Sequence, residues 1–279
     1  MIETRTIALG TLRFTVDLAG PAGGQPVLLL HGFPETRHMW RPQMEALAAA
    51  GYRAIAPDQR GYSTGARPAA LDAYRVERIV EDAVMLMHVL GIAQFHLVGH
   101  DWGGQIAWLV TARHSDKVRS LTVLSRPHPA AFVRAMEEDP DQSRRSRHHR
   151  AYREDSAVIE MRRAELRPIR AALIAQNVPA AFADIHVATL AEPGGIEGAM
   201  NWYRATGFAA DDTPVITVPT LYVWGDKDST VGRYAAELTR DYVTGAYRFV
   251  TLADAGHFLV DEFPDEVTAL LLAHIAANS

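Results

Sequence analysis

The chain has 279 residues, of which 48% are hydrophobic and 22% charged, a composition typical of a globular protein with one large domain or one and a half. Its net charge of −5 argues against nucleic acid or an anionic membrane as a partner, and the absence of cysteine excludes disulfides and thiol catalysis. Its first residues lack a signal-peptide profile and no apolar run approaches the roughly 20 residues of a membrane span, so we expect a cytoplasmic protein.

The first half of the chain alternates strands with helices. Two strands of alternating polarity are predicted first, and continuous apolar runs typical of buried parallel strands follow them. The predicted strands are residues 5–9, 12–18, 27–30, 53–56, 95–98 and 118–124, and the predicted helices are residues 39–50, 76–90 and 105–114. This alternation predicts an α/β protein with a mostly parallel central sheet flanked by helices.

The alternation stops after the sixth strand. Residues 129–212 contain helical stretches rich in Ala, Arg and Glu, without a convincing buried strand. The pattern then resumes with predicted strands at residues 220–224 and 247–252 and predicted helices at residues 232–242 and 264–277. We therefore expect a core domain of residues 1–128 and 213–279, with a helical cap domain of residues 129–212 over the carboxyl ends of the strands, where open parallel sheets bind ligands.

The most informative segment is GHDWGG at residues 99–104. It follows a predicted buried strand and begins a predicted helix, which is the arrangement of the nucleophile elbow of α/β-hydrolases. The flanking glycines leave room for a strained turn that lifts the central side chain clear of the sheet. That central residue is Asp101, where most members of the fold carry serine. A carboxylate nucleophile forms an ester by attacking an sp3 carbon, a chemistry different from acyl transfer.

The elbow requires an acid and then a histidine farther along the chain. Asp228 follows the next buried strand, and His257 follows the last one. His257 would activate water, and Asp228 would fix the tautomer of His257 and stabilise its imidazolium form. A single loop histidine or turn aspartate is usually structural, and Asp226 is the alternative acid. The order of the residues and their positions at strand ends favour a triad of Asp101, Asp228 and His257.

Two backbone N–H groups are candidates for an oxyanion hole. One belongs to Trp102, directly after the nucleophile, and the other to Phe33, in the loop after the third strand. The side chains of Trp102, Phe33 and Tyr152 are also candidates for substrate contact. Further candidates for pocket walls, most of which we expect to be ordinary core residues, are Trp40, Phe132, Leu173, Ile185 and Phe258.

Taken together, the motifs resemble the α/β-hydrolase-fold epoxide hydrolase family over nearly the whole chain. The motifs are HGFPE at residues 31–35, DQRGYS at residues 58–63, the elbow, NWYR at residues 201–204, Asp228 and His257. The aspartate elbow and NWYR are the more specific of these. The DxRG pattern is common to the wider fold, so we interpret Asp58 and Arg60 as loop-stabilising residues.

The resemblance implies hydrolysis of a small apolar epoxide in two steps, without a cofactor or a metal. Asp101 would attack an oxirane carbon while an acid of the cap protonates the opening oxygen. His257 would then activate water to hydrolyse the ester. Tyr203 matches one of the family's two ring-opening tyrosines. His148 occupies the position where the family often has the other, and Tyr152, one helical turn farther on, is the alternative donor.

Other functions remain open at this stage. A haloalkane or haloacid dehalogenase would use the same aspartate, but Phe33 offers no side-chain donor for a halide, and Trp102 and Gln105 stand where arginines would hold a haloacid carboxylate. A carboxylate nucleophile disfavours an esterase, and an intact triad argues against a non-catalytic binding protein on the same scaffold. The basic residues 144–150 indicate a solvated helix face rather than a nucleic-acid site. The sequence leaves the oligomeric state open, with a homodimer as one alternative.

Overall fold

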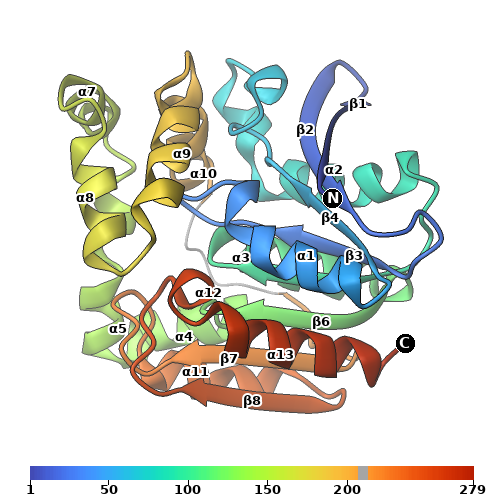
Figure 1. Ribbon diagram of the computed structural model, residues 1–279. Helices are drawn as coiled ribbons and strands as arrows, with labels where there is room; N and C mark the ends of the chain where they lie inside the picture. The colour runs from blue at the N-terminus through green and yellow to red at the C-terminus, as the bar shows by residue number, and fades with distance from the viewer. Residues whose placement is uncertain (207–212) are drawn as a thin grey trace.

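The computed structural model describes residues 1–206 and 213–279. Within these ranges, eight strands form one sheet in the order β1-β2-β4-β3-β5-β6-β7-β8 (Figure 1). β2 pairs antiparallel with β1 and β4, and the other pairs are parallel. The strands are β1 (Glu3–Leu9), β2 (Leu12–Ala19), β3 (Pro26–Leu30), β4 (Arg53–Pro57), β5 (Phe95–His100), β6 (Val118–Leu124), β7 (Thr220–Gly225) and β8 (Tyr247–Leu252). The predicted mostly parallel sheet is confirmed.

Helices cover both faces of this sheet. Successive side chains of a strand point to opposite faces, and β3 shows the result clearly. Leu29 belongs to the apolar cluster under α1 (Arg41–Ala49) and α13 (Pro264–Ala276), whereas Leu28 belongs to the cluster under α2 (Val76–Val89) and α3 (Trp102–Arg113). Both leucines are fully buried, as expected for a strand between two helical layers. The other helices of the C-terminal part are α11 (Arg233–Leu238) and α12 (Leu259–Glu262).

Three predicted helices differ from the structure by more than one residue at an end. The helix expected at residues 105–114 begins at Trp102, directly after the elbow aspartate. The helix expected at residues 39–50 starts as a 3₁₀ turn, Arg37–Trp40, and only then continues as α1. A proline occupies the first turn of α1, where a missing N–H costs no helical hydrogen bond. The helix expected at residues 232–242 is α11 followed by a 3₁₀ turn, Thr239–Tyr242.

A group of seven helices lies between β6 and β7 in the described part of the sequence. Figure 1 shows several of them at the carboxyl ends of the parallel strands. They are α4 (Pro129–Glu138), α5 (Pro140–Arg145), α6 (Arg147–Ala151), α7 (Asp155–Arg163), α8 (Arg167–Ala175), α9 (Ala180–Ala191) and α10 (Gly195–Ala205). The expected end of the cap at residue 212 lies outside the described residues. None of the described helices is long and apolar enough to cross a membrane.

The helix α10 is held against the loop after β4 by two close contacts. The Trp202 indole N–H donates to the Arg60 carbonyl at 2.7 Å. Gly198 and Gly61 touch so closely that a Cβ on either would lie 2.6 Å from the carbonyl oxygen of the other. Arg60 itself is paired with Asp82, as expected for a loop-stabilising residue. Because Tyr203 follows Trp202, these contacts fix the position of Tyr203 relative to the sheet.

Candidate active site

Asp101 lies on a strained turn between β5 and α3. Its φ and ψ are 50° and −120°, in a region that non-glycine residues rarely adopt. The turn closes tightly because the flanking residues lack side chains: a Cβ on Gly99 would lie 2.3 Å from the Gly103 carbonyl oxygen, and one on Gly103 would lie 2.1 Å from that of Leu30. The sequence GHDWGG therefore folds as the elbow that its glycines predict.

The loop after β3 supplies a hydrogen bond to the Asp101 carboxylate. The Phe33 backbone N–H donates to Asp101 Oδ1 at 2.9 Å. Burial alone would raise the pKa of Asp101, but His257, His100 and the Phe33 N–H together lower it below its ordinary value. Trp102 is the first residue of α3, so its N–H has no partner within the helix. Asp101 is thus an anion at neutral pH, next to both N–H groups expected in an oxyanion hole.

His257 lies between two carboxylates. Its Nε2 is 3.6 Å from Asp101 Oδ2, and its Nδ1 is 3.2 Å from each oxygen of Asp228. Burial lowers the pKa of His257, but the charges of Asp228 and Asp101 outweigh burial and raise it to about 10. Asp226, the alternative acid, instead accepts the Asp254 N–H at 2.8 Å. The structure therefore brings Asp101, His257 and Asp228 together in the order expected for the triad.

Two hydroxyl groups join the contact between His257 and Asp228. Ser125 Oγ is 2.8 Å from His257 Nδ1 and donates to Asp228 Oδ2. Thr230 Oγ1 is 2.5 Å from the same nitrogen and donates to Asp228 Oδ1 at 2.8 Å. The Asp228 carboxylate also accepts the backbone N–H groups of Thr230 and Val231. A buried carboxylate with this many donors stays ionised, in agreement with its lowered pKa.

A second histidine, His100, binds the backbone of the His257 loop. His100 lies in β5, and its Nε2–H donates to the His257 carbonyl at 2.8 Å. Its Nδ1 is 3.0 Å from Glu35 Oε2, and both side chains are fully buried. Burial lowers the pKa of His100 to about 4 and raises that of Glu35 to about 7. A neutral imidazole that donates through Nε2 has an acceptor at Nδ1. Asp261 is the carboxyl group next to Glu35, and burial and the Glu35 charge raise the pKa of Asp261 well above its ordinary value.

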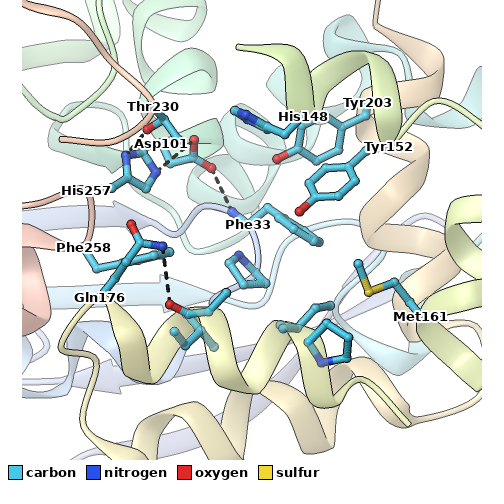
Figure 2. Close-up of a pocket in the computed structure, with 15 residues that line it drawn as sticks. Phe33, Asp101, His148, Tyr152, Met161, Gln176, Tyr203, Thr230, His257 and Phe258 are labelled. Atoms are coloured by element: carbon cyan, nitrogen blue, oxygen red, sulfur yellow. Dashed lines mark hydrogen bonds and ion pairs between the residues drawn. The ribbon is translucent and has the colours of Figure 1, made fainter. Parts of the chain in front are cut away.

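Two tyrosines of the inserted helices face Asp101 across a cavity. Tyr203 is in α10, and Tyr152 directly follows α6. Their ring centroids are 5.2 Å apart in an edge-to-face arrangement, and Figure 2 shows the Tyr203 hydroxyl directed toward the Asp101 carboxylate and the Tyr152 hydroxyl directed into the cavity. Burial raises the pKa of both phenols, that of Tyr203 well above 10. Both therefore carry their protons throughout the physiological pH range.

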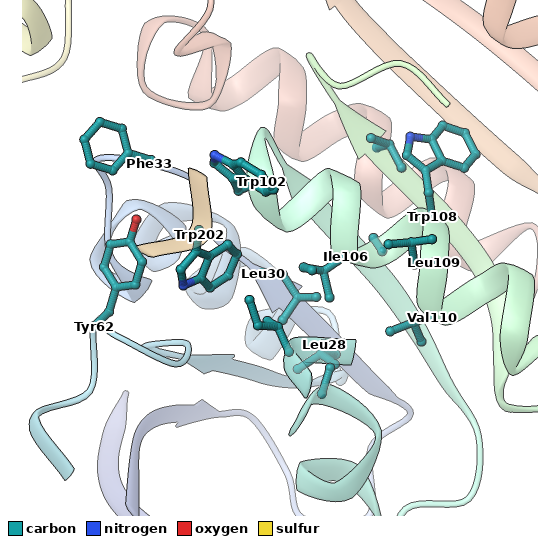
Figure 3. Packing of buried hydrophobic residues seen from close by; sticks show 14 of the residues in the cluster. Leu28, Leu30, Phe33, Tyr62, Trp102, Ile106, Trp108, Leu109, Val110 and Trp202 are labelled. Carbon is teal, nitrogen blue, oxygen red and sulfur yellow. The ribbon is translucent and has the colours of Figure 1, made fainter. Parts of the chain in front are cut away.

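The Trp102 ring does not take the place expected for a substrate contact. Among the described residues it is absent from the cavity wall and packs edge-to-face behind Tyr203, with centroids 5.1 Å apart. The reason is that Trp102 is the first residue of α3 and lies beside α10, so its ring packs against Tyr203. Figure 3 shows the Trp202 ring on another side of it. Phe33 and Tyr152, the other two expected contacts, do line the cavity.

His148 also lines the cavity, beside both tyrosines. Its ring centroid is 5.8 Å from that of Tyr152 and 6.4 Å from that of Tyr203. The Nδ1 atom lies 3.0 Å from the Arg145 carbonyl oxygen. Burial is the main cause that lowers the pKa of His148 below its ordinary value. At neutral pH the ring is therefore uncharged.

The cavity has a volume of about 220 Å³ and one polar end. Asp101, His257, His148 and the two tyrosines form that end, and the rest of the wall is largely apolar. The apolar wall consists of Phe33, Pro34 and Phe258 from the core, Met161 from α7, and Pro168, Ile169, Ala172 and Leu173 from α8. Leu173 and Phe258 were expected there, whereas Trp40 packs in the core beneath α1 and α13.

Comparisons with known proteins identify the family. Residues 25–264 match the family described as alpha/beta hydrolase fold. Epoxide hydrolase A of Mycobacterium tuberculosis is 33% identical, and the match covers 96% of this chain and 95% of the relative. The chain belongs to the α/β-hydrolase-fold epoxide hydrolase family. It is an enzyme of the epoxide hydrolase type.

Solved structures extend the comparison to the whole fold. One solved structure has a TM-score of 0.88 and 28% identity to this chain, with 99% of each chain covered. It is described as a novel epoxide hydrolase of the alpha/beta hydrolases superfamily, from metagenomes of hot environments. An epoxide hydrolase from Bacillus megaterium, solved with an inhibitor, has a TM-score of 0.89 at 24% identity and covers 98% of this chain. The second likeness concerns the fold alone.

Sequence reasoning did not assign a role to four residues of this epoxide hydrolase family member. Glu35 lies in the HGFPE motif and His100 in the elbow motif. Their positions beside predicted site residues could therefore have indicated a role in the site. Ser125 and Thr230 carry no such signal, because their contacts with His257 depend on how the ends of β6 and β7 meet in space.

Gly32 offers a direct test of how tightly the nucleophile is packed. A Cβ at Gly32 would lie 2.4 Å from Asp101 Cβ and 2.5 Å from its Oδ1. We expect Gly32→Ala to displace the carboxylate and lower kcat/KM by at least about 100-fold, since catalysis is this sensitive to misplacement. The control is Gly23→Ala, where an added Cβ meets nothing within 4 Å. Equal activities of the two variants would contradict the expected displacement.

Proposed function

We propose that the protein hydrolyses an epoxide to a vicinal diol through a covalent ester on Asp101. One observation carries this proposal: an ionised carboxylate faces two protonated phenols across a mostly apolar cavity. Such a pair suits a three-membered ether, which needs a nucleophile at carbon and an acid at oxygen at the same time. The substrate class proposed here is a small epoxide with an apolar substituent.

In the first step, Asp101 Oδ2 attacks an oxirane carbon and the C–O bond of the ring breaks. Oδ1 is the oxygen that accepts the Phe33 N–H, so it becomes the carbonyl oxygen of the ester. The electron pair of the broken bond goes to the oxirane oxygen, which takes a proton from a phenol of the cap. Because Oδ2 faces His257, the new ester bond forms within reach of the base that acts next.

Tyr203 and Tyr152 are the proposed proton donors, and His148 is not. A donor must carry a hydrogen on the atom that faces the substrate. Both phenols do, because burial raises their pKa values. The neutral His148 ring uses its one N–H on the Arg145 carbonyl, which leaves no hydrogen on Nε2. The Trp102 ring behind Tyr203 is proposed to hold this phenol in place.

In the second step, His257 takes a proton from water, and the water attacks the ester carbonyl. The oxyanion forms on Oδ1, where the N–H groups of Phe33 and Trp102 are proposed to stabilise it. Collapse of this intermediate breaks the bond between the carbonyl carbon and Oδ2, and the leaving alkoxide takes the proton from His257 to give the diol. The proton of the carboxylic acid left on Asp101 restores the phenol that was deprotonated in the first step, so Asp101 becomes a carboxylate again. The reaction requires water alone, so we propose no cofactor and no metal.

The two steps should depend on pH differently. Alkylation needs Asp101 as an anion, and the lowered pKa of this residue keeps it ionised. Hydrolysis needs neutral His257, whose pKa is about 10 while Asp101 is charged. Esterification removes that charge, so the pKa of His257 in the ester lies lower and neutral base becomes available as pH rises. We therefore expect the alkylation rate to stay nearly constant between about pH 5 and 9 while the hydrolysis rate rises.

Rapid quenching followed by intact-protein mass spectrometry measures this difference. The fraction of ester at steady state should be highest at the acid end of the range. A fraction that rises toward the alkaline end would contradict the assignment of His257 as the base of the second step.

We also propose the division of the chain that the sequence suggests. In this proposal, residues 1–128 and 213–279 form the catalytic core, and residues 129–212 form a cap that supplies the phenols. The support is that Tyr152 and Tyr203 come from helices between β6 and β7, while Asp101, Asp228 and His257 come from strand ends.

Hydrolysis of an epoxide panel beside a haloalkane panel tests the proposed function. We expect diol formation from epoxides and no halide release from haloalkanes, since the apolar Phe33 side chain offers no N–H to a departing halide. Halide release without epoxide hydrolysis would overturn the proposal in favour of a dehalogenase. Absence of both reactions, with intact folding, would favour a binding protein.

A further inference from the structure

The two ring nitrogens of His148 differ in what they can do. Nδ1 lies 3.0 Å from the Arg145 carbonyl oxygen, one helical turn earlier. A carbonyl oxygen can only accept a hydrogen bond, so Nδ1 must carry the hydrogen. In a neutral imidazole the other nitrogen is then a bare acceptor. His148 therefore presents the lone pair of Nε2 as its free polar group.

The surroundings of His148 keep the ring neutral. Burial lowers its pKa most, and the Arg145 carbonyl and the Asp101 charge raise it less. The charged groups His257 and Arg126 lower it further. At neutral pH the cavity thus contains an acceptor nitrogen next to two phenol donors.

His31 shows what the complete form of this arrangement looks like in the same protein. Its Nδ1 donates to the Gly32 carbonyl at 3.0 Å, and its Nε2 accepts the Gln59 N–H at 3.1 Å. His148 has the first of these bonds, but no donor in residues 1–206 and 213–279 reaches its Nε2. Since His148 lines the cavity, the missing donor can come from a molecule bound there.

We propose that His148 Nε2 accepts a hydrogen bond from a hydroxyl or N–H group of the substrate, next to the oxirane. The inference rests on the proposed function and specifies its substrate class: epoxides with a donor on the carbon beside the ring, of the 2,3-epoxy alcohol type. The tyrosines beside His148 donate hydrogen bonds to the oxirane oxygen. This places the hydroxyl or N–H group of the substrate, one carbon away from the ring, near the imidazole of His148. The rest of the substrate packs against the apolar wall of Ile169 and Leu173.

A pair of substrates that differ in one donor tests this proposal. The pair is a 2,3-epoxy alcohol and its O-methyl ether, which has the same oxirane but no hydrogen to donate. We expect the wild-type enzyme to prefer the alcohol by roughly tenfold in kcat/KM, the discrimination expected of one hydrogen bond in a buried site. In His148→Phe, which keeps an aromatic ring but has no acceptor, the preference should fall to about twofold or less.

Arg147→Ala is the matched control, because Arg147 is the exposed neighbour of His148 on α6. It should keep the wild-type preference. A wild-type enzyme without a preference would overturn the proposal, and so would a His148→Phe variant that loses activity on both substrates in equal proportion. Either result leaves the proposed function standing, whereas failure to hydrolyse both substrates in the wild type contradicts that function itself.

A measurement on the wild-type protein avoids any effect of the substitution on folding. ¹⁵N NMR of the histidine side chains should show Nδ1 of His148 protonated and Nε2 unprotonated at neutral pH. Addition of the triol product of the epoxy alcohol should shift the Nε2 resonance, and addition of the diol product of the O-methyl ether should shift it less. A protonated Nε2 in the free enzyme would overturn the proposal.

Discussion

The double variant Tyr152→Phe/Tyr203→Phe should lose at least about 10³-fold in the rate of alkylation, the range that general acid catalysis contributes. The reason is that the opening oxirane oxygen would develop negative charge in a buried, mostly apolar cavity without a proton donor. In each single variant the alkylation rate should also fall, because one proton donor is missing. The logarithm of that loss should be less than half of the logarithm of the loss in the double variant, because the remaining phenol still donates. Single-turnover kinetics with excess enzyme measures the alkylation rate directly.

Tyr234→Phe is the matched control for these variants. Tyr234 lies on the exposed side of α11, where its hydroxyl bonds to Glu138, outside the cavity. It should retain wild-type kinetics. If the double variant alkylates at a rate within about tenfold of wild type, the phenols are not the ring-opening acids and another donor must be sought.

The variant His257→Gln should stop turnover after the first step. Glutamine cannot act as a general base, so hydrolysis of the ester should slow by at least about 10³-fold. Asp101 keeps its Phe33 hydrogen bond, so attack on the epoxide continues. Intact-protein mass spectrometry should show one added epoxide mass, and peptide mapping should place it on Asp101.

His88→Gln, on the exposed surface of α2, is the control for this variant. It should turn over normally without accumulating an adduct. An adduct on a residue other than Asp101 would show that this other residue is the nucleophile. Loss of turnover without any adduct would show that His257 is needed before the ester forms, contrary to its proposed role.

Local sequence patterns predicted the architecture because each element depends on short-range physics. Continuous apolar runs identified the parallel strands, and glycines at residues 99 and 103 identified a turn in which two backbones touch. The order of Asp101, Asp228 and His257 along the chain was informative because parallel strands present their carboxyl ends at one edge of the sheet.

The finer features of the site could not be predicted from the sequence. Whether His148 donates or accepts depends on which of its nitrogens meets a carbonyl, and that is a matter of helix geometry. The burial of the Trp102 ring depends on the contact between α10 and α3. This contact joins residues about 100 positions apart in the chain, so no local pattern records it.

Isotope labelling during a single turnover distinguishes an ester on Asp101 from direct attack of water on the epoxide. Excess enzyme and one epoxide are mixed in water enriched in ¹⁸O, and both the diol and the Asp101 peptide are analysed. If an ester forms on Asp101, the new oxygen of the diol comes from the carboxylate and is unlabelled, while Asp101 gains ¹⁸O. If water attacks the epoxide directly, the diol carries ¹⁸O and Asp101 stays unlabelled, which would contradict the proposed mechanism.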